Sequence, residues 1–446
     1  MADQNLFLQR RPEFEPEAPR RYYALFDQAS GGHLFFEAVS ADFFDDLRRK
    51  PEGVRQWAEF APKAPIYVIE LKDAVARKFE RWAGWTPRAF RGRPEKLEDP
   101  VEPPPTWFEF WLQPGAADAN LYFNLYGEGR WVQVNARRVS DPVAAQLSAA
   151  FSLHDYEATQ DEIEQVLANL TGTIEWVGVY DVGQGGANGL CDSTATPLAY
   201  FDLGGAVLAN TSSFPASWLT DFCYAQAPPV VLSHWDWDHW SSGNTFPTAQ
   251  TLDWIVPNQS LGAVHTTFAS GLASANKLWV WPASLPDVRV GKVTIRKCTG
   301  SGRNHSGLAL EVVGPQGQEP ILLTGDARYT AVPGATGRDY TSVVAPHHGA
   351  DMKSSAVPTG LQLPGARTAY SFGQNNTFQH PRPVTQKNHH SQGWPHKSQG
   401  ARTGLEIETV ALRPGLGHIG LGWVAQPRLP QHSCGAASCA VDLKQT

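Results

Sequence analysis

A short stretch of the sequence, VVLSHWDWDHWSSG at residues 230–243, concentrates side chains of the kinds that bind metals. In an extended or tightly looped segment, residues two apart project to the same side, which places His234, Asp236 and Asp238 together. His239 follows in the turn. Two imidazoles and two carboxylates this close are costly to desolvate unless a cation neutralises them. The spacing therefore predicts a metal site with the interleaved tryptophans as its dry shell, and a polar surface loop is the alternative.

Other apolar runs in the second half of the sequence also lie next to residue types that bind metals. Asp326 ends PILLTGD, and His347 and His348 end SVVAPHHG. His305 precedes an apolar run in GRNHSGLALEV, and His380 lies in QNNTFQHPRP. A lone histidine is more often structural than a ligand, but several in one region favour a shared metal site.

The elements that must position these residues are expected to be short buried strands. After about residue 173, the apolar runs WVGVYDVG, LAYFDLGG, PVVLSHW, PILLTGD and TAYSFG each end in a polar or glycine-containing turn. Strands of this form deliver polar side chains to one edge of a sheet, where α/β layered proteins usually carry their sites. The histidines agree with this placement, because 12 of the 14 lie at or after His234.

The first 170 residues are expected to form a separate N-terminal domain of mixed α+β structure. RYYALF, GHLFFEAV, PIYVIEL, WFEFWLQ, NLYFNLYG and RWVQVNARRV read as strands, and residues 41–60 read as a helix broken near Pro51. Residues 91–107, rich in proline and charge, are expected to be a surface loop or linker. This half shows no catalytic constellation. Its aromatic residues are therefore expected in a core, with a surface for a protein partner as the alternative.

The composition, 42% hydrophobic and 18% charged over 446 residues, is typical of a soluble globular protein. No run of about 18 apolar residues is present, so neither a transmembrane helix nor a membrane partner is expected. The first 21 residues lack the apolar core of a signal peptide, and five cysteines are few and odd in number. These features predict a cytoplasmic protein. The net charge of −7 argues against a protein that coats nucleic acid, but it permits a local basic groove.

The ordered motifs resemble the metallo-β-lactamase superfamily, and most closely its ComEC-like branch. The superfamily signature is H-x-H-x-D-H, whereas this sequence has H-x-D-x-D-H at residues 234–239. The ComEC-like proteins are similar in often carrying Asp at that second position. YDVGQGGANGL, LAYFDLGG, NHSGLALEV, ILLTGD, VVAPHHGA and SFGQNNTFQHP resemble further motifs of the branch in the same order, over roughly residues 173–385.

The resemblance implies an αββα sandwich over residues 171–425, followed by a C-terminal tail at 426–446. Two divalent ions, Zn²⁺ or Mn²⁺, would lie at one edge of the sandwich, where water or hydroxide attacks an ester. The resemblance assigns the following ligands: His234, Asp236 and His305 to the first ion, Asp238, His239 and one of His347 and His348 to the second, and Asp326 to both.

Two of these residues, and His380 besides, are expected to act in catalysis. Asp238 and Asp326 would hold the attacking water, and His380 would face a substrate phosphate or support the metal ligands. Asp236 in place of histidine makes the site harder, which favours Mn²⁺ while leaving Zn²⁺ plausible. The sequence departs from the family pattern at residues 240–243, where WSSG replaces the usual glycine pair. It also departs at His305, so that either Asn304 or His305 could fill the ligand position.

The resemblance and the charge pattern favour a phosphodiester substrate. Residues 352–405 contain six Lys or Arg and no Asp or Glu, and the part from 379 to 402 reads as a flexible basic loop. Asn376, Arg382 and Lys387 are expected to bind the substrate, so a nuclease acting on DNA is predicted. The loop could instead be merely solvated, or its histidines could bind a further metal. The alternative functions are hydrolysis of a small molecule, such as a cyclic nucleotide or an ester, and a binding protein on this fold.

Overall fold

The structure is a computed structural model, and it describes residues 5–9, 20–30, 33–72, 75, 79, 106–215, 222–352, 356–361, 366–394, 406–408 and 418–423. The expected C-terminal tail and most of the expected linker lie outside these residues. The chain divides into two compact units. Unit 1 comprises Met1–Asp155, Val207–Ala209 and Ser260–Asn276, and unit 2 comprises Tyr156–Ala206, Asn210–Gln259 and Lys277–Thr446. Unit 1 therefore includes a helical segment from the second half of the sequence.

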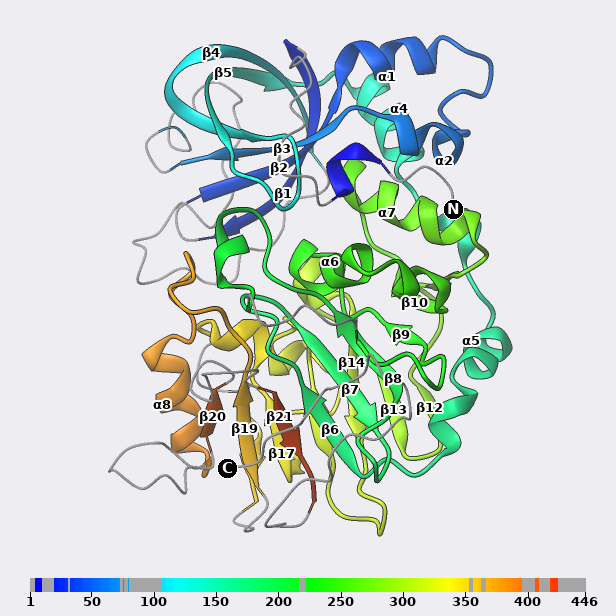
Figure 1. Cartoon of the computed structure of the whole chain (residues 1–446), viewed down its shortest axis with the longest axis vertical. Coiled ribbons are helices and arrows are strands. Elements are labelled where there is room, and N and C mark those ends of the chain that lie inside the picture. Colours follow the sequence, from blue (N-terminus) through cyan, green and yellow to red (C-terminus); the bar gives the residue numbers. More distant parts are fainter. Residues whose placement is uncertain are drawn as a thin grey trace. The chain divides into compact units, whose positions relative to one another are not determined.

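Unit 1 is built around five strands. Its elements are η1 (Leu6–Leu8), β1 (Arg21–Ser30), β2 (His33–Ser40), α1 (Ala41–Arg48), α2 (Trp57–Phe60), η2 (Ala61–Lys63), β3 (Ile66–Leu71), β4 (Trp107–Tyr122), β5 (Arg130–Arg138), α4 (Asp141–Ala150), η5 (His154–Tyr156, the last residue of which belongs to unit 2) and α7 (Ala263–Ser274). The strands lie in the order β1-β2-β3-β4-β5, and β1 also pairs with β4, so the first four close on themselves (Figure 1). One continuous strand, β4, replaces the two strands expected from WFEFWLQ and NLYFNLYG.

Aromatic side chains fill the interior of this closed sheet. Phe36 contacts the rings of Phe79, Phe108 and Phe110, with centroids 5.1–5.8 Å apart and mostly edge to face. The β5 strand alternates exposed and buried residues, which is the period of a strand with one face on a core. The aromatic residues of the first half thus form a core, as expected.

The described residues of unit 2 form two seven-stranded sheets and one two-stranded sheet. Its elements are α5 (Gln160–Val166), η6 (Ala168–Thr171), β6 (Trp176–Val179), β7 (Ala187–Cys191), β8 (Pro197–Leu203), η7 (Leu208–Ser213, which begins in the unit 1 segment), β9 (Val230–Val231), α6 (Trp237–Thr245), η8 (Pro247–Thr251), β10 (Trp254–Pro257), β11 (Leu278–Trp281), β12 (Val288–Val290), β13 (Val293–Lys297), η9 (Arg303–His305), β14 (Leu308–Val312), β15 (Ile321–Leu323), η10 (Tyr329–Ala331), β16 (Asp339–Tyr340), β17 (Ser342–Val344), η11 (Pro346–Gly349), β18 (Thr359–Gly360), β19 (Arg367–Tyr370), α8 (Pro383–Ser391), β20 (Glu406–Glu408) and β21 (Ile419–Leu421). The sheet orders are β11-β10-β9-β8-β7-β6-β21 and β12-β13-β14-β15-β17-β19-β20.

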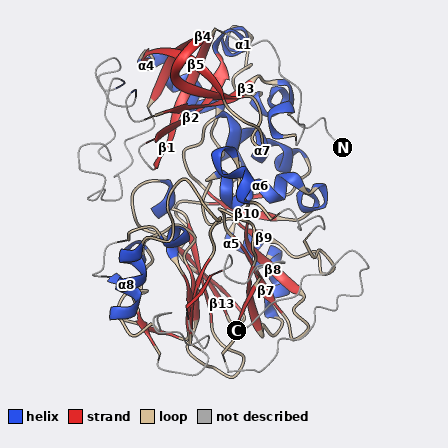
Figure 2. Cartoon of the chain, turned by 60° about the vertical axis from the view of Figure 1, so that its left-hand side comes forward, coloured by secondary structure: helices blue, strands red, loops and turns tan. Residues whose placement is uncertain are grey.

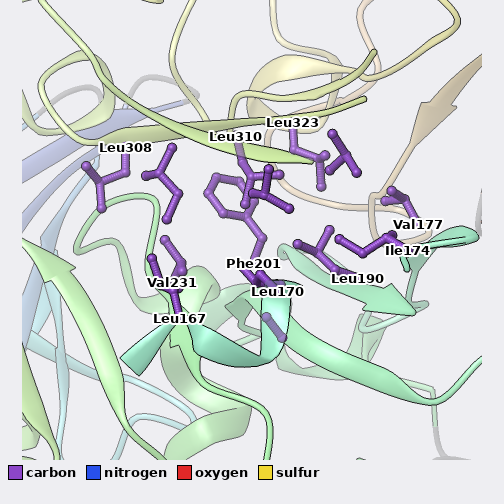
Figure 3. Packing of buried hydrophobic residues seen from close by; sticks show 14 of the residues in the cluster. Leu167, Leu170, Ile174, Val177, Leu190, Phe201, Val231, Leu308, Leu310 and Leu323 are labelled. Carbon is purple, nitrogen blue, oxygen red and sulfur yellow. The ribbon is translucent and has the colours of Figure 1, made fainter. Parts of the chain in front are cut away.

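The two sheets of unit 2 share one apolar core. Phe201 and Val231 come from one sheet, and Leu308, Leu310 and Leu323 come from the other, and all are essentially inaccessible to solvent (Figure 3). Figure 2 shows the strands of unit 2 as two layers. The mixed α/β class expected from the sequence is therefore confirmed, whereas its assignment to the αββα sandwich of one superfamily stays a prediction.

The structure corrects the expectation of a flexible basic loop after residue 379. Residues Pro383–Ser391 form the helix α8. His389 on this helix is buried, and its imidazole contacts the hydroxyls of Tyr329 and Tyr370 at 2.7 and 3.1 Å. The sequence pattern misled because polar residues on the exposed side of a short helix resemble a solvated loop. Residues 395–405 of the expected loop lie outside the described residues.

Two further expectations concern the chain as a whole. None of the helices that the structure describes has the length and apolar character needed to cross a membrane. Cys191, Cys223 and Cys298 are buried free thiols, and Cys434 and Cys439 fall in the tail that the structure does not describe.

The buried carboxylate of Glu70 provides a test of the hydrogen bonding inside unit 1. Burial raises the pKa of Glu70, but hydrogen bonds with His33, Asn120 and Tyr122 outweigh burial and leave the pKa below its usual range. A lowered folded-state pKa contributes stability that is complete above the unfolded pKa of about 4.3 and is lost as the pH falls through the folded value.

We therefore expect Glu70→Gln to unfold at lower urea than wild type at pH 7, with the difference shrinking toward pH 3. Urea midpoints measured between pH 7 and pH 3 would check this. Glu128→Gln, an exposed glutamate of the same unit, is the matched control. A wild-type-to-variant difference that stays constant with pH would contradict the assignment.

Candidate metal centre

The residues singled out by the sequence come from loops that follow parallel strands. In one sheet β8 and β9 run parallel, and in the other β15, β17 and β19 run parallel. The carboxyl ends of parallel strands meet at the same edge, so the loops after them converge. The site residues at these strand ends are Asp202 within the last two residues of β8, His234 to His239 after β9, Asp326 after β15, His347 and His348 after β17, and Ser371 after β19.

The stretch SHWDWDH is part loop and part helix. The sequence suggested an extended or looped segment, but α6 begins at Trp237, so Asp238 and His239 lie in its first turn. A carboxylate in the first turn is favoured by the helix dipole. The Asp238 carbonyl accepts hydrogen bonds from the amides of Gly186 and Gly205, at 3.0 and 3.1 Å. A Cβ at Gly204 would lie only 1.7 Å from this carbonyl oxygen, which explains why glycine occupies that position.

Five of the predicted ligands come together in two overlapping groups. The atoms that they offer as ligands lie within 4.8 Å of one another in each group. The groups are His234, His239 and Asp326, and Asp238, His239 and His348. Nε2 of His239 lies 3.0 Å from Oδ1 of Asp326, and Nε2 of His348 lies 3.2 Å from Oδ2 of Asp238. The tryptophans at 235, 237 and 240 are buried around this segment, as the sequence predicted.

The central atoms of these groups lack hydrogen-bond partners. Within the described part of the chain, Nε2 of His234, His239 and His348 and Oδ1 of Asp326 are buried with no hydrogen bond. A buried polar atom left unpaired costs about 1–3 kcal/mol. Because these atoms are close together and still not bonded to one another, their lone pairs fit a cation placed among them. The residues present therefore fit a bound divalent metal.

The electrostatics of the centre also favour a cation. Burial lowers the pKa of His239, but Asp326 and Asp202 outweigh it and raise the pKa well above its usual range. Burial raises the pKa of Asp326, but the histidines at 347, 239, 348 and 234 outweigh it and hold the pKa well below its usual range. Burial lowers the pKa of His348, but Asp326 and Asp238 outweigh it and raise the pKa above its usual range. The carboxylates thus create a field that attracts positive charge.

Asp202 supports the centre and was not among the predicted ligands. Its Oδ2 lies 2.8 Å from Nδ1 of His239 and accepts a hydrogen bond from the Ser233 hydroxyl, and its Oδ1 accepts one from the Ser233 amide at 2.6 Å. Asp202 has a φ of +61°, a conformation that Asp tolerates better than most residues. A carboxylate on the second nitrogen of an imidazole fixes its orientation for metal binding. The signal in the sequence is the strand end LAYFDLGG, which has the same form as PILLTGD.

Asp236 is held by a buried arginine that sequence reasoning also missed. Nε of Arg303 donates to Oδ1 of Asp236 at 2.7 Å, and both side chains are buried. Burial raises the pKa of Asp236, but Arg303 and His234 outweigh it and hold the pKa well below its usual range. Oδ2 of Asp236 lies 3.2 Å from Nε2 of His234, so this oxygen is close to a candidate ligand atom of the centre.

His305 and His347 lie outside the two groups of described ligand atoms. His305 is buried, and its Nδ1 accepts a hydrogen bond from the Arg328 amide at 3.4 Å. Nε2 of His347 lies 3.4 Å from Oδ2 of Asp326, and its side chain is 24% exposed. Nδ1 of His348 donates to the Ser371 carbonyl at 2.9 Å, which turns Nε2 toward Asp238. The metal-ligand roles of Asp236, His305 and His347 stay predictions.

The segment that contains the residues predicted to bind substrate comes close to His347 through His380. The His380 ring is 5.4 Å from that of His347, and burial followed by His347 and His348 lowers the pKa of His380 well below its usual range. The Asn376 side chain accepts from the His380 amide and donates to its carbonyl, so it shapes the loop. The Arg382 amide donates to the Gly349 carbonyl, directly after the histidine pair.

The structure describes only some of the other Lys and Arg residues between positions 352 and 405. Lys387 is exposed on α8, whereas Arg367 is buried in β19. Lys353, Lys397 and Arg402 lie outside the described residues.

Comparisons with known proteins assign the chain to no family. No protein-family model matches the chain, and no curated protein matches its sequence. Among solved structures, the chain is similar to Zn²⁺-bound PqqB from Methylobacterium extorquens, with 7% identity and a TM-score of 0.23, over 38% of this chain and 71% of that one. It is also similar to a protein of unknown function from Enterococcus faecalis V583, with 12% identity and a TM-score of 0.24, over 38% of this chain and 49% of that one. Likenesses this weak carry no weight for the fold or the function.

The contacts of Asp202 give a test of how the centre is supported. In Asp202→Asn, one carboxylate oxygen becomes an NH2 group, which accepts no hydrogen bond. Either the Ser233 amide, or both the Ser233 hydroxyl and His239, then lose their acceptor. Loss of such a supporting carboxylate typically weakens metal binding by about 10–100-fold. Calorimetric titration with Zn²⁺ and Mn²⁺ would measure the loss.

The matched control is Asp253→Asn, which removes a half-buried carboxylate of the same unit that pairs with Lys277. Its metal affinity should equal that of wild type. Equal losses in the two variants would show that Asp202 has no specific effect on the centre.

Proposed function

We propose that this chain is a metal-dependent hydrolase whose active site is the centre formed by the strand-end loops of unit 2. The convergence of buried, unbonded Nε2 atoms of His234, His239 and His348 around Asp326 carries the proposal. A purely structural cluster would be expected to satisfy these atoms by hydrogen bonds, because each unpaired group costs stability.

The ligand set proposed for the metals follows from the same atoms. His234, Asp236 and Asp326 would hold one divalent ion, with His305 close by, and Asp238, His239, His348 and Asp326 would hold the second. Zn²⁺ and Mn²⁺ both suit a mixture of imidazole and carboxylate ligands. When bound, such ions lower the pKa of a coordinated water and stabilise negative charge on the substrate.

The surrounding residues have separate tasks in this proposal. Asp202 and the Ser371 carbonyl fix the rings of His239 and His348 through their Nδ1 atoms. Arg303 keeps Asp236 ionised and leaves one of its oxygens for the centre. The Asp238 side chain is 17% exposed, so its carboxylate can accept a proton from water that enters from solvent. The buried tryptophans exclude water from the other side of the segment.

The accessible side of the centre favours a substrate larger than the interior can hold. The cavity lined by Asp202, His239, Asp326, His348 and Ser371 has about 20 Å³ of space, enough for one water molecule. The substrate must therefore approach from the exposed side, where Asp238 and His347 are accessible. Arg382 and Lys387 supply positive charge on the segment that follows His380. We infer a phosphodiester, with DNA as the first substrate to test and a cyclic nucleotide or an ester as the alternative.

The catalytic proposal is tested with the purified full chain. Incubation with plasmid, single-stranded DNA, RNA, a cyclic dinucleotide and a nitrophenyl ester, with Mn²⁺, Zn²⁺ or EDTA, would reveal the substrate class. Asp326→Asn should lower the rate by more than about 100-fold, because it removes a proposed ligand rather than a support. Cleavage that EDTA leaves unchanged, or no cleavage of any substrate with either metal, would rule out the proposed activity.

The role of the basic side chains of Arg382 and Lys387 is tested separately, by the salt dependence of DNA affinity. If Arg382 and Lys387 contact phosphates of single-stranded DNA, replacing each by Gln should reduce the slope of log affinity against log salt by about 0.7. Binding is measured with Asp326→Asn, which keeps the DNA intact. Arg289→Gln, an exposed arginine on β12, is the control that should leave the slope unchanged. Equal slopes in all variants would place the DNA elsewhere.

A further inference from the structure

The two metal ions proposed for unit 2 would have neighbours of opposite charge. Beside the ligands of the first ion, Nε of Arg303 donates to Oδ1 of Asp236 at 2.7 Å. Beside the ligands of the second ion, Oδ2 of Asp202 lies 2.8 Å from Nδ1 of His239. All four side chains are buried, so little water screens their charges. Arg303 and Asp202 are therefore expected to act on the binding of the two ions in opposite directions.

Arg303 competes with the first ion for the negative charge of Asp236. One oxygen of this carboxylate accepts from the guanidinium, and the other, Oδ2, lies 3.2 Å from Nε2 of His234. An ion held by His234 and Asp236 would thus share a carboxylate with an arginine, which stays positively charged at every working pH. Two positive charges this close in a dry interior repel each other, and the repulsion weakens the binding of the ion.

The fold fixes the position of Arg303. This residue begins η9, and its carbonyl accepts from Nε2 of Gln259 at 2.6 Å. Oε1 of the same glutamine accepts from the Trp235 amide at 3.2 Å. Gln259 therefore ties the backbone of Arg303 to the segment that carries His234 and Asp236. The arginine is built into the centre and is not a surface side chain that meets Asp236 by chance.

The ligands of the second ion keep their negative charge. Oδ2 of Asp238 lies 3.2 Å from Nε2 of His348, and Asp238 forms no ion pair with an arginine or lysine among the described residues. Asp202 adds a further carboxylate behind His239, and a carboxylate in this position strengthens an imidazole as a metal ligand. Asp326 is shared by both ions and does not distinguish them.

We propose that Arg303 makes the binding of the two ions unequal. The second ion is bound tightly, and the first ion is bound about 10–100-fold more weakly. At low concentrations of Zn²⁺ or Mn²⁺ the chain then holds one ion, and it takes up the other only when metal is abundant. The ligand sets are those of the proposed function, on which the proposal rests.

Calorimetric titration of the metal-free full chain with Mn²⁺ tests the effect of the arginine. The wild-type chain should bind one ion in a tight step and another in a weaker step. Arg303→Gln removes the positive charge but keeps an N–H group for Asp236, so the weaker step should tighten by about tenfold or more. Arg303→Lys keeps the charge and should keep the two steps apart. Arg289→Gln, an exposed arginine on β12, is the matched control and should leave both steps unchanged.

Variants of the ligands assign each step to its ion. His234→Gln should remove the weaker step and leave the tight one, whereas Asp238→Asn should remove the tight step. These variants keep Arg303, so they decide the matter even if Arg303→Gln fails to fold. After gel filtration in metal-free buffer, plasma mass spectrometry should find about one metal per wild-type chain and about two per chain of Arg303→Gln.

Three results would overturn the proposal. They are equal affinities for both ions in the wild-type chain, loss of the tight step in His234→Gln, and weaker metal binding in Arg303→Gln. The last would show that the arginine supports Asp236 as a ligand. Metal still binds in all three cases, so the proposed hydrolase would stand, whereas a wild-type chain that binds no metal would contradict both proposals.

Discussion

Unit 2 depends on the stable burial of several charged groups at one edge of its two sheets. Asp202, Asp236 and Asp326 are each at most 2% exposed, and isolated carboxylates are expensive in such surroundings. A different set of neighbouring groups stabilises the charge of each carboxylate. The Ser233 amide, the Ser233 hydroxyl and His239 surround Asp202, and Arg303 neutralises Asp236. Asp326 lies beside His234, His239 and His348, whose Nε2 atoms have no hydrogen bonds among the described residues. A cation placed among these atoms would satisfy them.

Among the described residues, side chains of metal-ligand types gather in unit 1 and in unit 2, and the two places differ in exposure. The centre in unit 2 has one partly exposed carboxylate, Asp238, and a partly exposed imidazole, His347, so solvent can reach it. Asp27, Glu37 and His265 in unit 1 are 3%, 1% and 0% exposed. Catalytic metals keep an open position, whereas structural metals are fully enclosed by protein ligands. The distinction rests on burial, because both sets contain the same residue types.

Sequence reasoning located the strand-end positions of Asp326 and His348, where chemistry and strand pattern coincide, and their ligand roles stay predictions. Asp326 and His348 follow apolar runs, and the sheet brings them to the edge where SHWDWDH begins. It was less successful where a helix is short: residues 237–245 and 383–391 form α6 and α8, although both were expected as loops or turns. Polar residues dominate these helices, and a helical period is hard to recognise over about nine residues. Arg303 could not be paired with Asp236, because 67 residues separate them.

The sequence by itself determined which residue types are available and that most follow buried strands, because local hydrophobic periodicity and side-chain chemistry are readable from adjacent residues. Tertiary structure alone decided which of these groups meet. In the folded chain, the Arg328 amide donates to His305, Asp202 contacts His239, and Asp27 and Glu37 lie beside His265. Contacts of this kind depend on strand register, on a bulge and on glycines that permit close approach. These features are set by packing over the whole unit rather than by neighbouring residues.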